Sequence, residues 1–84
     1  MNKKELLDKL KAIIEPYVQN EDGFSNLTDY TDFVKDLEIN SANLVDIVLD
    51  IEDEFDIEID NEAMEKMLSV KTSIEIIEEK LNSK

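Results

Sequence analysis

The sequence contains no Cys, no His and no Trp. Without Cys and His, the chain cannot form a Ser–His or Cys–His catalytic pair, a zinc site with His and Cys ligands, or a disulfide framework. Basic residues are also scarce, because nine Lys and no Arg face 22 acidic residues, for a net charge of −13. Nucleic acids and anionic membranes are bound mainly through Lys and Arg, so this balance argues against both kinds of partner.

The chain has only one Gly and one Pro, which favours helices over a turn-rich β fold. Its 84 residues are enough for one domain, spanning residues 1–84, and its 42% hydrophobic content is enough for a core. No apolar run approaches the roughly 18 residues of a membrane span, and the first residues do not resemble a signal peptide. We therefore expect a cytoplasmic protein without stable membrane insertion. We also expect a monomer, because no segment is typical of a dimer interface.

Hydrophobic spacing predicts an all-α fold, a small four-helix bundle with three main helices, one short helix and a long first loop. We expect the main helices over residues 3–18, 41–55 and 70–82, and the short helix over 61–67. Pro16 should kink or end the first helix. Residues 19–35 should form the loop, with its apolar side chains fixed against the core: Phe24, Leu27, Tyr30, Phe33 and Val34.

The helix expected from Ser41 to about Phe55 has two apolar sides. At about 100° per residue, the core side contains Leu44, Ile47, Val48, Ile51 and Phe55. Beside it lies a second group, which we call the acidic–apolar stripe: Ala42, Val45, Asp46, Leu49, Asp50 and Asp53. Val45 and Leu49 could be the edge of a wide core face, or the stripe could be a docking surface for another protein.

The negative charge is concentrated on and after this helix. Residues 36–65 contain no Lys and twelve acidic residues, which are Asp36, Glu38, Asp46, Asp50, Glu52, Asp53, Glu54, Asp56, Glu58, Asp60, Glu62 and Glu65. Such a field can be a solvated surface, or it can speed association with a basic partner. The spacing matches no EF-hand loop, because Asn61 or Phe55 stands where Gly is required, so we expect no dedicated metal site.

A recognisable motif surrounds Ser41. The run Asp36-Leu37-Glu38-Ile39-Asn40-Ser41-Ala42 precedes the helix, and Glu52-Asp53-Glu54-Phe55-Asp56 ends it. Together these runs resemble the acyl carrier proteins, whose motif is Asp-Leu-Gly-Ala-Asp-Ser-Leu and whose helix ends in a run like Glu-Glu-Glu-Phe-Asp. The spacing of the two flanking phenylalanines fits as well, and the match extends over about residues 33–77.

The resemblance implies that Ser41 carries a 4′-phosphopantetheine arm, added from coenzyme A by a separate phosphopantetheinyl transferase. The arm would hold acyl groups as thioesters and present them to fatty-acid or polyketide-type enzymes with basic surfaces, such as a ketosynthase, acyltransferase or acyl ligase. The family's docking residues fall on the acidic–apolar stripe. Its acyl pocket falls on Val48, Ile51, Phe55, Ile59, Met67 and Ile77. The protein would then be a carrier and not an enzyme.

Simpler interpretations stay open for these residues. Ser41 could be an ordinary N-cap, and the six pocket residues could be core alone. The chain also departs from the family motif, with Glu38 in place of Gly, Asn40 in place of Asp, and Ala42 in place of Leu or Met. These departures favour a specialised carrier. The alternatives are a peptidyl or aminoacyl carrier, and an unmodified carrier-like interaction module.

Overall fold

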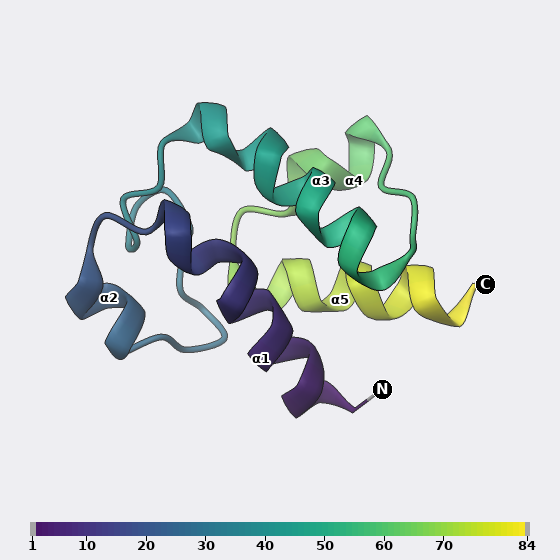
Figure 1. Cartoon of the computed structure of the whole chain (residues 1–84), viewed down its shortest axis with the longest axis horizontal. Helices are drawn as coiled ribbons and strands as arrows, with labels where there is room; N and C mark the ends of the chain where they lie inside the picture. Colours follow the sequence, from purple (N-terminus) through teal and green to yellow (C-terminus); the bar gives the residue numbers. More distant parts are fainter. Residues whose placement is uncertain (1, 84) are drawn as a thin grey trace.

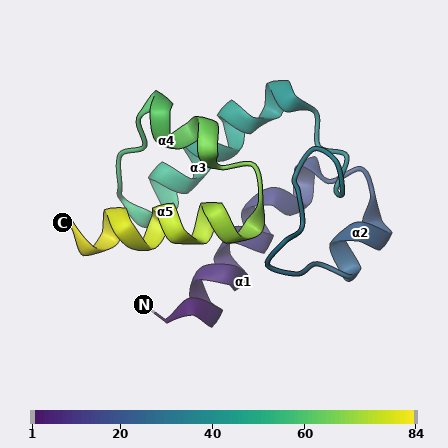
Figure 2. The same ribbon diagram turned by 180° about the vertical axis from the view of Figure 1, so that it is seen from behind.

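A computed structural model describes residues 2–83, and its regular elements are all helical. In chain order these are α1 (Lys3–Ile14), the 3₁₀ turn η1 (Glu15–Tyr17), α2 (Glu21–Ser25), the 3₁₀ turn η2 (Ser41–Asn43), α3 (Leu44–Phe55), α4 (Asn61–Lys66) and α5 (Val70–Asn82). The longest helices, α1, α3 and α5, surround a common core, and α4 lies beside α5 (Figures 1 and 2). The predicted all-helical fold is confirmed.

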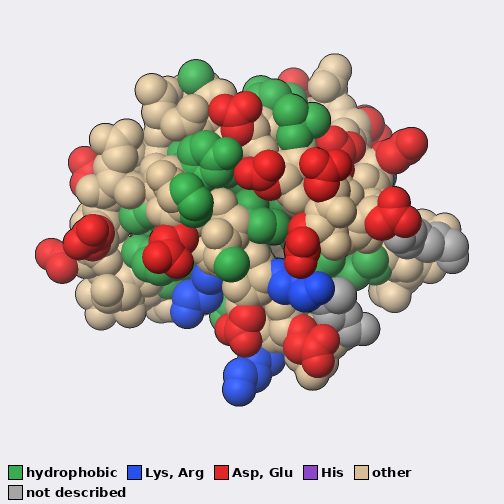
Figure 3. All heavy atoms as spheres, viewed as in Figure 1, with side chains coloured by type: hydrophobic (Ala, Val, Ile, Leu, Met, Phe, Trp, Pro, Cys, Tyr) green, Lys and Arg blue, Asp and Glu red, His purple; other side chains and the backbone are tan. Residues whose placement is uncertain are grey.

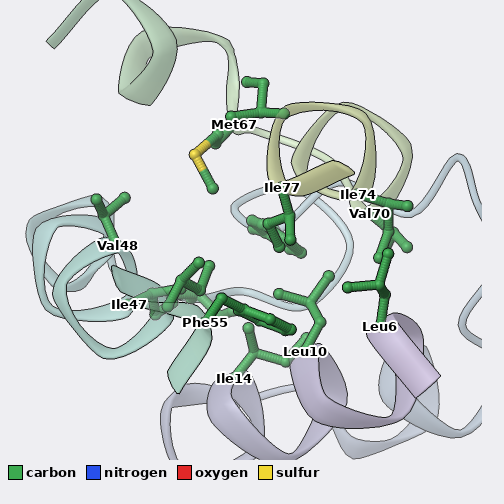
Figure 4. Packing of buried hydrophobic residues seen from close by; sticks show 14 of the residues in the cluster. Leu6, Leu10, Ile14, Ile47, Val48, Phe55, Met67, Val70, Ile74 and Ile77 are labelled. Carbon is green, nitrogen blue, oxygen red and sulfur yellow. The ribbon is translucent and has the colours of Figure 1, made fainter. Parts of the chain in front are cut away.

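Apolar side chains at helical spacing build this core. Leu6, Leu10 and Ile14 of α1 meet one face of α3 and one face of α5 (Figure 4). The α3 face consists of Ile47, Val48, Ile51 and Phe55, and the α5 face includes Val70, Ile74 and Ile77; all are buried. Burying one such side chain stabilises the fold by about 1.5–3 kcal/mol, so these three faces determine how the helices pack.

Most helix boundaries follow the expected local signals. Asn2 caps α1 by accepting a hydrogen bond from the Glu5 backbone, and α1 gives way to η1 just before Pro16, as predicted. Asp60 caps α4 in the same way, accepting from the Ala63 N–H at 2.7 Å. Ser69 and Thr72 form a reciprocal capping box at the start of α5.

The segment expected as a plain loop contains one more short helix, α2. The Asn20 side chain caps α2 by accepting from the Gly23 N–H, and its amide group donates to the Asp36 carbonyl at 2.8 Å. Gly23 is required here, because a Cβ on this residue would lie 2.4 Å from the Asp36 carbonyl oxygen. The sole glycine therefore allows α2 to pack directly on the backbone that leads to Ser41.

Backbone hydrogen bonds fix the rest of this segment. Phe33 donates to the Leu68 carbonyl at 2.9 Å, and Val70 donates to the Thr31 carbonyl at 3.0 Å. We call this pairing of residues 29–33 with 68–71 the loop clamp. Phe33 is buried as predicted. The prediction is wrong for Tyr30, which is 78% exposed and has the Lys71 ammonium 5.6 Å from the centroid of its ring, and for Val34, which is also exposed.

Glu38 has a left-handed backbone, with φ of 55°. This conformation brings two buried anchors, Leu37 and Ile39, onto either side of an exposed residue. The position is the one at which the motif of the acyl carrier proteins has Gly. Left-handed geometry costs a residue with a side chain about 1–2 kcal/mol, whereas Gly adopts it freely. The departure at Glu38 therefore lowers the stability of the loop before Ser41.

Glu38→Gly is expected to stabilise the protein by about 1 kcal/mol, because glycine removes the steric cost of the positive φ and part of the local negative charge. Urea unfolding followed by circular dichroism measures the change. Glu38→Gln removes the same charge but keeps the Cβ, and it should recover only a small part of the gain. Equal stabilisation by the two substitutions would assign the effect to charge alone.

Candidate functional site

Ser41 is exposed and is the first residue of η2, the turn that leads into α3. The preceding residue provides the cap, because the Asn40 side chain accepts a hydrogen bond from the Ala42 N–H at 2.9 Å. The interpretation of Ser41 as the N-cap is therefore wrong. An exposed Ser41 hydroxyl without a capping role is available for chemistry.

Buried side chains fix the segment that precedes Ser41. Leu37 and Ile39 are 0% and 1% exposed, and Ile39 donates to the Phe33 carbonyl at 3.0 Å. Asn43 then donates to the Asn40 carbonyl at 2.8 Å and closes the 3₁₀ turn. Because Asn is as effective an N-cap as Asp, the departure at Asn40 retains the turn while removing a negative charge beside Ser41.

The acidic–apolar stripe lies on the outside of α3. Val45 and Leu49 are 48% and 53% exposed, while the opposite face of the helix is buried in the core. Ala42, Asp46, Asp50 and Asp53 are exposed beside them. Over α3, hydrophobic and acidic side chains lie next to one another on the same face of the molecule (Figure 3). Val45 and Leu49 are thus not a covered edge of the core.

One residue of the stripe contacts the turn after α1. The Tyr17 hydroxyl donates a hydrogen bond to the Asp50 carboxylate at 3.2 Å. Partial burial, this hydrogen bond and the negative charges of Asp50 and Asp46 raise the pKa of Tyr17 above its usual range. The sequence pattern did not reveal this contact, which fixes the position of Asp50 on the exposed face.

Other carboxylates near the end of α3 have structural roles. Glu52 accepts a hydrogen bond from the Ile59 N–H at 2.7 Å and so holds the segment between α3 and α4. Glu54 pairs with Lys9 of α1, with 3.4 Å between the charged groups. The two residues therefore differ from the carboxylates of the stripe, which project from the exposed side of the helix.

The six residues expected to line an acyl pocket come from α3, the segment between α3 and α4, the end of α4, and α5. Val48, Ile51, Phe55, Met67 and Ile77 are at most 6% exposed and belong to one core cluster. Figure 4 shows Met67 and Ile77 across the core from Phe55, with Val48 at the left edge of the cluster. Ile59 is half-buried and lines a surface hollow of about 410 Å³ with Glu52, Glu58, Asp60 and Lys80.

Residues 2–83, the part of the chain that the structure describes, contain neither of two further kinds of site. Within that range no His, Cys, Asp and Glu side chains gather in a group able to hold a metal ion. None of the helices described there combines the length and the apolar character needed to cross a membrane.

An exposed serine in the 3₁₀ turn that leads into α3, next to an outward-facing acidic–apolar stripe on a small helical fold, is the arrangement of a carrier domain. Similarity to known proteins agrees, although no protein-family model matches the chain. The acyl carrier protein of Petrotoga mobilis is 34% identical over 82 residues, covering 98% of this chain and 94% of that protein. The acyl carrier protein of Coprothermobacter proteolyticus is 32% identical over 84 residues, which is the full length of both.

A solved structure of the acyl carrier protein from Enterococcus faecalis matches with a TM-score of 0.78 and 31% identity. The match covers 95% of this chain and 99% of that one. The chain therefore belongs to the acyl carrier protein family. The similarity noted from the sequence motif, the helical fold and the acyl carrier function are confirmed.

Proposed function

We propose that Ser41 is the attachment site of a 4′-phosphopantetheine arm, on which this protein carries acyl groups as thioesters. The observation that carries the proposal is the exposed Ser41 at the start of η2, the turn that leads into α3, with the cap of that turn supplied by Asn40. The chain has no Cys, so an attached arm is how it would acquire a thiol. The residues present therefore fit the group.

Attachment would use Ser41 as the nucleophile. Its Oγ attacks the phosphorus of coenzyme A that bears the pantetheine, forming a phosphodiester, while the bond to the other phosphate breaks. Adenosine 3′,5′-bisphosphate leaves with that electron pair, and the serine proton passes to a base on the transferase. The positive end of the α3 dipole favours the negative phosphodiester that results. We assign the catalysis to the transferase, with this chain as its substrate.

The bound arm would supply a terminal thiol for the acyl thioester. For the acyl chain we propose the space among Val48, Ile51, Phe55, Ile59, Met67 and Ile77. These side chains already form an apolar cluster between α3 and α5. They would shelter the acyl chain from water by the same burial that stabilises the core.

The proposed function is tested by intact mass before and after incubation with coenzyme A and a broad-specificity phosphopantetheinyl transferase. We expect a gain of one phosphopantetheine, and peptide mapping should place it on Ser41. No gain would favour the unmodified interaction module, unless a dedicated transferase that accepts Asn40 and Ala42 restores it. The cytoplasmic location and monomeric state remain predictions.

We further propose that the acidic–apolar stripe docks the transferase and the acyl-processing enzymes through basic surfaces. Asp46→Lys is expected to lower kcat/KM for phosphopantetheine transfer roughly tenfold at low salt, and less at high salt, because it reverses a steering charge. Asp46 is preferable to Asp50 for this test, because Asp50 also accepts the Tyr17 hydrogen bond. Initial rates at two salt concentrations measure the effect.

Glu78→Lys is the matched control, because it makes the same change of charge at an exposed position on α5, away from the stripe. It should leave kcat/KM nearly unchanged. If both variants lose the same activity, the effect comes from net charge, and docking at the stripe is contradicted.

A further inference from the structure

Ser73 is a polar residue sealed inside the apolar core. It lies in α5 and is 0% exposed, and its hydroxyl has no hydrogen-bond partner among the described residues. Buried hydroxyls in folded proteins almost always have a partner, and one without a partner raises the free energy of the folded state. The Ser73 hydroxyl is therefore either a packing defect or a hydrogen-bonding group for a ligand that enters the core.

The local structure explains why the hydroxyl is unsatisfied. A serine inside a helix usually turns its hydroxyl back to the carbonyl four residues earlier, here that of Ser69. That carbonyl already accepts the Ser73 N–H at 3.1 Å, and the Thr72 hydroxyl lies 3.2 Å away as a second donor. A carbonyl oxygen has two lone pairs, so the capping box of α5 leaves none for the Ser73 hydroxyl.

The position of Ser73 connects it to the proposed acyl pocket. In a helix, residues three and four apart lie next to each other, so Ser73 adjoins Val70 on one side and Ile76 and Ile77 on the other. Ile77 is one of the six pocket residues, and Val70 and Ile77 belong to the same core cluster. An acyl chain packed against Ile77 would therefore pass close to the Ser73 hydroxyl.

We infer that Ser73 is a specificity-determining residue that favours acyl chains bearing an oxygen, as a keto or hydroxyl group along the chain, over saturated chains. The inference rests on the proposed function of Ser41. A saturated chain leaves the hydroxyl without a partner, whereas an oxygen at the right depth pairs with it. A site with a buried hydrogen-bonding group discriminates against ligands that lack the matching group. One such bond favours the oxygenated chain roughly tenfold.

The experiment compares eight-carbon cargoes on the full chain. The transferase attaches the acyl-phosphopantetheine part of each acyl-coenzyme A to Ser41, with octanoyl or an eight-carbon chain bearing a keto group at carbon 3, 5 or 7 as the thioester, and loading is confirmed by mass. Hydroxylamine cleavage of each thioester then measures sequestration, with each rate divided by that of the same acyl group on free pantetheine. We expect at least one keto chain to be protected about tenfold more than octanoyl, and Ser73→Ala to abolish this difference.

A second measurement does not require loading. Ser73→Ala removes the unsatisfied hydroxyl, so it should raise the melting temperature of the unmodified protein by roughly 5 °C. Ser25→Ala, at an exposed serine on α2, should not. A lower melting temperature for Ser73→Ala would show that the hydroxyl already has a partner and would overturn the inference.

The failures of the two proposals are distinguishable. Loading with equal protection of keto and saturated chains, or a keto preference that survives Ser73→Ala, overturns the role of Ser73 and leaves the proposed function of Ser41 intact. Absence of any transfer to Ser41 in the mass spectrum overturns the proposed function, and the inference with it.

Discussion

Ser41→Ala is expected to keep the mass of the unmodified chain after incubation with coenzyme A and the transferase, and to remain folded. The hydroxyl is the sole nucleophile proposed for the transfer, so its loss should abolish modification. The fold should tolerate the change, because Ser41 is exposed and the cap of the turn comes from Asn40. We expect a change of less than about 0.5 kcal/mol in the free energy of unfolding.

Two control variants make this result specific. Asn40→Ala should cost about 1 kcal/mol through the lost cap, yet it should still be modified, because the serine is intact. Ser25→Ala, at an exposed serine on α2, should match the parent in both mass and stability. A modified Ser41→Ala protein would contradict the assignment of the attachment site. An unfolded one would contradict the division of roles between Asn40 and Ser41.

Gly23→Ala should have the largest effect on stability. The added Cβ would lie 2.4 Å from the Asp36 carbonyl oxygen and 3.0 Å from the Asn20 side-chain nitrogen, so α2 would have to move from the segment that precedes Ser41. Overpacking of this kind costs about 1–3 kcal/mol, and each kcal/mol lowers the melting temperature of a domain this small by about 4–8 °C. Thermal unfolding followed by circular dichroism measures the loss.

A substitution to Ala elsewhere in the same helix separates this contact from general effects on α2. Ser25→Ala leaves the packing on Asp36 unchanged and should keep the parent's melting temperature. Gly→Ala by itself favours a helix. A stabilised Gly23→Ala protein would therefore mean that the backbone before Ser41 moves away from the added Cβ at little cost in free energy. That result would contradict the close packing of α2 on this segment.

Periodicity predicted the features that depend on one helix face. The 100° spacing correctly placed Ile47, Val48 and Ile51 in the core and separated Val45 and Leu49 from them, since burial in a helix follows residue spacing. Pro16 and Asp60 marked helix boundaries for equally local reasons. The motif around Ser41 indicated the family, which the relatives and the solved structure confirm.

Features that depend on tertiary contacts were not predictable in this way. The short α2 has a glycine at its centre and no apolar period, and it exists because Asn20 caps it and Gly23 lets it pack on Asp36. Asn40 and Ser41 are both good N-caps, so their order alone could not show which side chain caps the turn. A signal for Glu38 was present, since the family motif has Gly there, but its positive φ required the structure.

The loop clamp joins parts of the chain that are far apart in sequence, and this has a consequence for the order of events during synthesis. Phe33 donates to the Leu68 carbonyl, and Lys71 donates to the Asp29 carbonyl, so the segment before Ser41 is fixed by residues made much later. Such long-range pairing forms only after the closing entropy of the intervening chain is overcome. The segment before Ser41 therefore reaches its folded arrangement only after residues up to about Lys71 have left the ribosome, and we expect the modification proposed for Ser41 to follow the synthesis of this segment.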